Sequence, residues 1–63
     1  MSVILFVKNL TTEDDVRRID EALAQTRLTY RIRLADRCVI IDGEGDAIYT
    51  AKVTLTEAGY SVE

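Results

Sequence analysis

A chain of 63 residues is long enough for one small domain, and such a domain buries only about 60% of the surface that its unfolded chain exposes. Its 8 basic and 11 acidic residues give a net charge of −3, which argues against nucleic-acid binding because phosphate contacts need clustered Lys and Arg. One cysteine excludes an internal disulfide, and there is no histidine. With a thin core and no disulfide, we expect a partner subunit to add stability.

The first predicted element is a strand over residues 3–8, where β-branched and other apolar side chains precede Asn9. No apolar run approaches the roughly 20 residues that cross a bilayer. The apolar start has no basic residues before it and no small-residue cleavage site after it, so we do not expect a signal peptide. These features predict a cytoplasmic protein with no membrane contact.

A helix is predicted to begin after Thr12 and to end near Gln25. The Thr12 side chain can accept a hydrogen bond from the amide three residues later, and Asp15 supports the first turn much as in a capping box. Apolar side chains then recur with the period of an amphipathic helix at Val16, Ile19 and Leu23.

From residue 28 the apolar period changes to two, which predicts a half-buried strand. In this strand Tyr30, Ile32 and Leu34 alternate with Arg31 and Arg33. A short turn over residues 35–37 leads to a returning strand over residues 38–41. Residues 42–45 then have the composition of a turn.

A second helix is predicted with Asp46 as its cap, and Gly59 stands where a left-handed residue commonly ends a helix. Residues 60–63 are predicted to form a closing strand. We therefore expect residues 1–63 to be one α+β domain with the element order β-α-β-β-α-β. This is the ferredoxin-like sandwich, with an antiparallel four-stranded sheet in the order 4-1-3-2 and both helices on one face.

Three segments resemble the heavy-metal-associated domains of copper chaperones and metal-transporting ATPases. Val7-Lys8-Asn9-Leu10-Thr11-Thr12 lies where that family has Val-x-Gly-Met-Thr-Cys. Ala22-Leu23 lies at the Ala-Leu pair of its first helix, and Ala58-Gly59-Tyr60-Ser61-Val62 matches its closing Ala-Gly-Tyr-x-Val. The resemblance spans nearly the whole chain and implies the same fold and a connection with metal transport.

The resemblance places Thr12 and Asp15 at the two cysteines with which the family binds soft metals. A soft ion such as Cu(I) requires thiolates, which a hydroxyl and a carboxylate do not replace. A hard cation is the alternative, but calcium takes about six to eight oxygens, usually from a loop that wraps around it. We therefore expect a capped helix start with neither metal nor cofactor.

Cys38 is the remaining candidate ligand, outside the family's site. A lone cysteine most often packs as a small apolar residue. In the alternative, Cys38 of two chains meets at a dimer axis and forms a disulfide or a two-thiol metal site.

If Val39 and Ile41 face the helices, the opposite face of the sheet carries a central apolar patch. This patch would comprise Ile4, Phe6, Cys38 and Ile40, flanked by Arg31 and Arg33. Its side chains either shield one another beneath the arginine stems or form an interface with a second copy or another protein.

Enzyme activity is not expected, because the chain has no histidine, no nucleophile beside a base and no phosphate-binding glycine loop. Phe6 alone on an acidic domain also argues against RNA binding by the sheet. The sequence thus predicts a non-catalytic module for protein interaction or dimerisation, related to heavy-metal transport proteins. The alternative is a copper-type chaperone or sensor with atypical ligands such as Cys38.

Overall fold

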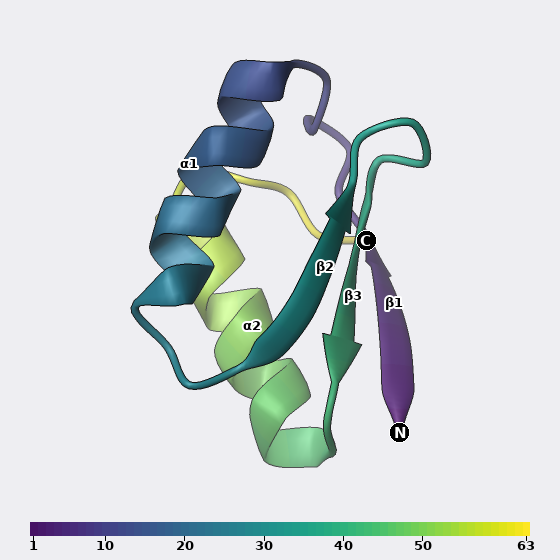
Figure 1. Ribbon diagram of the computed structural model, residues 1–63, viewed down its shortest axis with the longest axis vertical. Coiled ribbons are helices and arrows are strands. Elements are labelled where there is room, and N and C mark those ends of the chain that lie inside the picture. The colour runs from purple at the N-terminus through teal and green to yellow at the C-terminus, as the bar shows by residue number, and fades with distance from the viewer.

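The computed structural model describes residues 1–63. Its elements are β1 (Ser2–Phe6), α1 (Glu13–Ala24), β2 (Thr29–Arg33), β3 (Cys38–Asp42) and α2 (Gly45–Glu57). Both helices lie on one face of the sheet and leave the other face open (Figure 1). Neither helix combines the length and the apolar character that crossing a membrane requires.

The sheet is antiparallel and three-stranded, in the order β1-β3-β2. The central strand is β3, in which Ile40 lies opposite Ile4 of β1 and Arg31 of β2. The predicted four-stranded sheet in the order 4-1-3-2 is therefore wrong. The end of the chain contributes only an isolated antiparallel bridge between Val62 and Val7.

The way in which α2 ends keeps residues 60–63 from forming a regular strand. The amide of Tyr60 donates to the carbonyl of Leu55 (2.9 Å) and the amide of Gly59 donates to that of Thr56 (3.0 Å). These two bonds form a Schellman motif, which requires the positive φ of 93° that Gly59 adopts. Because the Tyr60 amide is used to end the helix, the chain can become extended only beyond it.

The side chain of Asn9 then forms hydrogen bonds with the backbone groups that a neighbouring strand would otherwise use. Its Nδ2 donates to the carbonyl of Gly59 (3.0 Å), and its Oδ1 accepts from the amide of Ser61 (2.8 Å). An amide side chain thus replaces part of a β-ladder, which leaves room for one bridge only.

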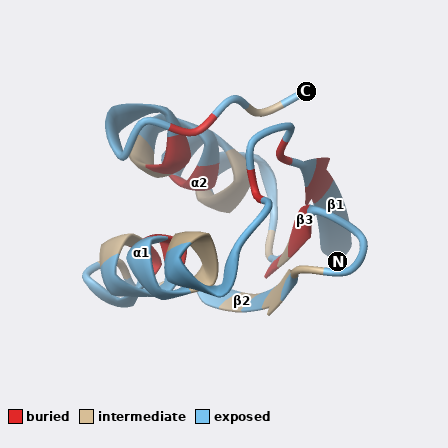
Figure 2. Cartoon of the chain, turned by 90° about the horizontal axis from the view of Figure 1, so that it is seen from above, coloured by how far each residue is buried: buried red, intermediate tan, exposed pale blue.

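The core lies between the sheet and the helices, where the buried residues gather (Figure 2). Ile19 and Leu23 of α1 are fully buried, as the helical period predicts. Val39 and Ile41 of β3 face the helices, which meets the condition on which the predicted apolar patch depends. The core cluster comprises Leu5, Val7, Leu10, Ile19, Leu23, Val39, Ile41, Ala51, Leu55 and Tyr60.

The start of α2 differs from the prediction. Gly45 is the first helical residue, and Glu44 occupies the cap position without a capping hydrogen bond from its side chain. Asp46 lies in the first turn instead, where a negative charge suits the positive end of the helix dipole. The prediction that Asp46 caps this helix is therefore wrong.

Candidate functional site

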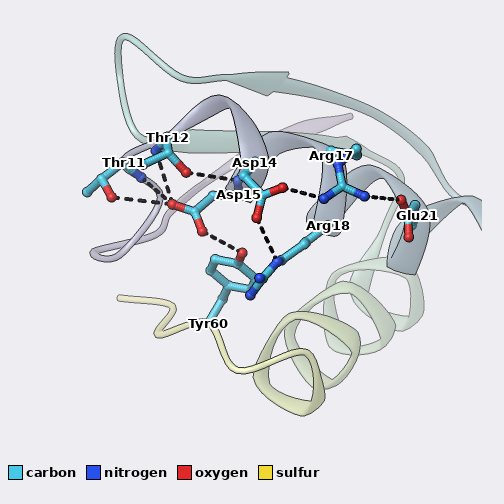
Figure 3. Close-up of polar contacts among 8 residues, drawn as sticks. All are labelled: Thr11, Thr12, Asp14, Asp15, Arg17, Arg18, Glu21 and Tyr60. Atoms are coloured by element: carbon cyan, nitrogen blue, oxygen red, sulfur yellow. Dashed lines mark hydrogen bonds and ion pairs between the residues drawn. The ribbon is translucent and has the colours of Figure 1, made fainter.

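The loop before α1 and the first turn of this helix contain Thr12 and Asp15, which the sequence resemblance aligns with the metal-binding cysteines of heavy-metal-associated domains (Figure 3). Thr12 is extended, with φ −130° and ψ 163°, and its Oγ1 accepts from the amide of Asp15 (3.1 Å). In return, Asp15 Oδ2 accepts from the amide of Thr12 (3.0 Å). This reciprocal pair is the predicted capping box, and the structure confirms it.

The Asp15 carboxylate accepts from four donors in all. Besides the Thr12 amide, Oδ2 accepts from the amide (3.1 Å) and the hydroxyl (3.3 Å) of Thr11. The other oxygen, Oδ1, accepts from the hydroxyl of Tyr60 (2.8 Å). We call Thr11, Thr12, Asp15 and Tyr60 the Asp15 cluster. These donors, with Tyr60 the largest contributor, hold the pKa of the Asp15 carboxyl well below its usual range.

Tyr60 brings the end of the chain to this loop. Tyr60 is 6% exposed and belongs to the core, while its hydroxyl reaches Asp15, 45 residues earlier. Burial, followed by the bond to the negative Asp15, raises the Tyr60 pKa. Sequence reasoning gave Tyr60 no role in the site, and the only available signal was the Ala58-Gly59-Tyr60 match to the resembling family.

Of the two other acids at this helix start, Asp14 pairs with arginines and Glu13 forms no ion pair. Asp14 contacts Arg17 and also Arg18, whose Nε lies 3.0 Å from Oδ2. Arg17 in turn contacts Glu21 (3.1 Å). All these side chains are exposed, so the pairs add little to stability. They do offset the negative charge of Asp14, which a cation would otherwise seek at this position.

The donor atoms at Thr12 and Asp15 do not suit a soft metal. They supply one hydroxyl and one carboxylate, whereas Cu(I) favours thiolate ligands. Nowhere in the chain do three His, Cys, Asp or Glu side chains gather in a geometry that could hold an ion. The Asp15 cluster therefore has the chemistry of a helix cap joined to the core.

The open face of the sheet carries the predicted apolar patch. Ile4 is 54% and Phe6 is 50% exposed, and Ile40 lies between them and β2 as a half-buried side chain. A shallow hollow of about 310 Å³ lies on this face, and Arg33 at its edge pairs with Asp36 (3.1 Å). The hollow is lined by Ile4, Phe6, Arg33, Asp36, Cys38 and Ile40.

Cys38 lies on this face but is covered. It is 3% exposed, and its cross-strand neighbours are Phe6 on β1 and Arg33 on β2. These two larger side chains flank a small one on the central strand. A thiol in this position contributes to the floor of the hollow and is not presented at the surface.

Comparison with known proteins gives one informative match. No protein-family model matches the sequence, and no curated protein matches it. Among solved structures, the chain is similar to a heavy metal binding protein from Thermotoga maritima, determined by NMR, with a TM-score of 0.88 and 23% sequence identity. The match covers 100% of this chain and 92% of that one. The chain therefore has the α+β fold of that protein.

Proposed function

We propose that this chain is a non-catalytic protein-interaction module, built on the fold of a heavy-metal-associated domain whose soft-metal site has been replaced by a helix cap. The observation that carries the proposal is the Asp15 cluster. At the two positions of the family's cysteines, Thr12 and Asp15 bond to each other, and Tyr60 ties Asp15 to the core. The loop is thus held by hydrogen bonds in a place where the family would use it to bind an ion.

The proposal is tested by titrating the reduced protein with Cu(I) in competition with a chromophoric chelator. We expect the wild-type protein not to compete. A matched variant, Thr12→Cys with Asp15→Cys, restores the cysteine pair at the same backbone positions and is expected to compete. Competition by the wild-type protein would overturn the proposal. A folded double variant that fails to compete would contradict the alignment of these positions with the family's ligands.

The open sheet face is the surface that would contact a partner. It combines exposed Ile4 and Phe6 with Arg31, which forms no ion pair. A desolvated apolar centre with an unpaired cation at its margin suits a protein segment that presents an apolar side chain beside a carboxylate. Selection of a random peptide library against the wild-type protein, with counter-selection against Ile40→Asp, should enrich such sequences. If the selected peptides bind the Ile40→Asp variant as well as they bind the wild-type protein, this face is excluded as the binding surface.

The similarity to a solved heavy metal binding protein favours a second candidate function, a metal carrier or sensor. In this chain it would require Cys38 from two copies, because no other sulfur ligand except Met1 is present. The same Cu(I) titration separates the two candidates. Competition that is lost in Cys38→Ser and retained in Thr12→Ala would support the carrier.

A further inference from the structure

The outer edge of β1 has no partner strand along its N-terminal half. Figure 1 shows β1 at the margin of the sheet, with β3 on one side of it. On the other side, the chain's last residues reach only as far as the pairing of Val62 with Val7. The N-terminal half of β1 therefore borders open space.

The direction of the backbone groups can be read from the hydrogen bonds at both ends of β1. The carbonyl of Met1 accepts from Gly43 (2.6 Å) and the amide of Val7 donates to Arg37 (2.8 Å), both on the β3 side. Backbone groups alternate along a strand, so those of residues 3 and 5 also face β3, while those of residues 2, 4 and 6 face outwards.

The contact at the end of the chain agrees with this assignment. The carbonyl of Phe6 accepts from the amide of Glu63 (2.8 Å), on the outer side of β1. The outward amides and carbonyls of Ser2 and Ile4 have no such partner in the protein. They form a short template for another antiparallel strand.

The side chains of β1 also lack the features that protect sheet edges. The segment Ser2–Phe6 contains no charge and no proline, and Val3, Ile4 and Phe6 are at least 36% exposed. The opposite edge, β2, carries Arg31 and Arg33. Charged side chains on an edge strand discourage the pairing of another strand. The β2 edge is therefore protected from such pairing, and the β1 edge is not.

We propose that β1 is a dimerisation strand, which pairs antiparallel with β1 of a second copy in a register centred on Val3. In this register Ser2 and Ile4 of one copy exchange backbone hydrogen bonds with Ile4 and Ser2 of the other. The two sheets become one continuous sheet of six strands, with both open faces on the same side. The inference does not depend on the loss of metal binding.

The register follows from the position of Glu63. Centring on Ile4 would place Ser2 of the second copy opposite Phe6, where Glu63 already lies. Centring on Val3 leaves that contact intact and sets the half-exposed Val3 side chains opposite each other. A second copy is the favoured occupant because an uncharged antiparallel edge complements itself under two-fold symmetry.

An edge contact of this length is small, so we expect a weak dimer. Sedimentation equilibrium up to about 1 mM protein should show a reversible dimer. Amide hydrogen exchange at high and low concentration then locates the contact. The Ile4 amide should gain protection with concentration, whereas those of Val3 and Leu5, which face β3, should be protected at both. The Phe6 amide, which lies outside the proposed register, should stay unprotected.

Three variants separate this edge from the open face. Ser2→Pro removes an outward amide at the first residue of the strand and leaves the β3 ladder intact. It costs two hydrogen bonds per dimer, so dimerisation should weaken about thirtyfold. Ser2→Ala keeps the amide and should dimerise as the wild type does, and Ile40→Asp should also dimerise.

Three results would overturn the proposal. The first is a wild-type protein that stays monomeric throughout the concentration range. The second is a dimer that Ile40→Asp abolishes and Ser2→Pro does not, which would place the contact on the open face. The third is an Ile4 amide whose protection is independent of concentration, which would mean that a segment other than a second copy covers the edge.

Discussion

Leu10→Ala tests whether core packing holds the loop before α1 in place. Leu10 stands where the resembling family has methionine, and its side chain is 0% exposed within the core cluster. Truncating a fully buried leucine loses both its transfer free energy and the contacts around the cavity, typically about 3 kcal/mol. A domain of 63 residues has only about 3–9 kcal/mol of total stability. The variant should therefore lose at least a third of it.

Urea unfolding followed by circular dichroism measures this loss. With a slope of about 1 kcal/mol per molar urea, the midpoint should fall by about 3 M. The matched control is Val53→Ala on α2, which truncates a side chain that is 36% exposed and should change stability by no more than about 0.5 kcal/mol. If Leu10→Ala shifts the midpoint no further than the control, packing of Leu10 does not anchor the loop, and the hydrogen bonds of the Asp15 cluster alone hold it in place.

Three further predictions concern the site and the open face. Thr12→Ala deletes the oxygen that accepts from the Asp15 amide and should lower stability by about 1 kcal/mol in urea, an effect whose absence would contradict the capping box. Because the pKa of Asp15 is lower in the folded protein, its ionised form contributes stability that is complete above its ordinary pKa of about 3.9 and is lost as pH falls towards the folded value. The stability of Asp15→Asn should lack this pH-dependent contribution. Identical acid-unfolding profiles of the wild-type protein and Asp15→Asn would refute the assignment. Cys38, being 3% exposed, should react with a thiol reagent only as fast as the protein opens, so immediate reaction in native buffer would show that the thiol is accessible.

Periodic patterns predicted the parts of this fold that repeat. The 3.6-residue spacing identified Ile19 and Leu23 as buried, and the two-residue spacing identified Tyr30, Ile32 and Leu34 as partly buried side chains that pack against the core. The capping box was also predictable, because its two partners lie three residues apart. In each case the determining interactions are local in sequence.

Apart from the cap of α2, the errors lie where distant segments meet. A closing strand was predicted from four residues, but the structure ends α2 through the Tyr60 amide and binds residues 59–61 with the Asn9 side chain. The contact of the Asn9 side chain has no local signature, since Asn9 and Ser61 are 52 residues apart. The contact between Tyr60 and Asp15 was missed for the same reason. The burial of Cys38 was also not predictable from alternation, because it depends on the size of its neighbours on two other strands.

The bonds from Asn9 and Asp15 to residues 59–61 also set the order of events during synthesis. A ribosome releases the chain from its first residue onwards, yet the segment around the start of α1 takes its partners from residues 59–61. The emerging polypeptide can form its turns and helices early, but Asn9 and Asp15 cannot make these bonds until residues 59–61 have left the exit tunnel. Native closure of the domain therefore depends on the release of residues 59–61 from the ribosome.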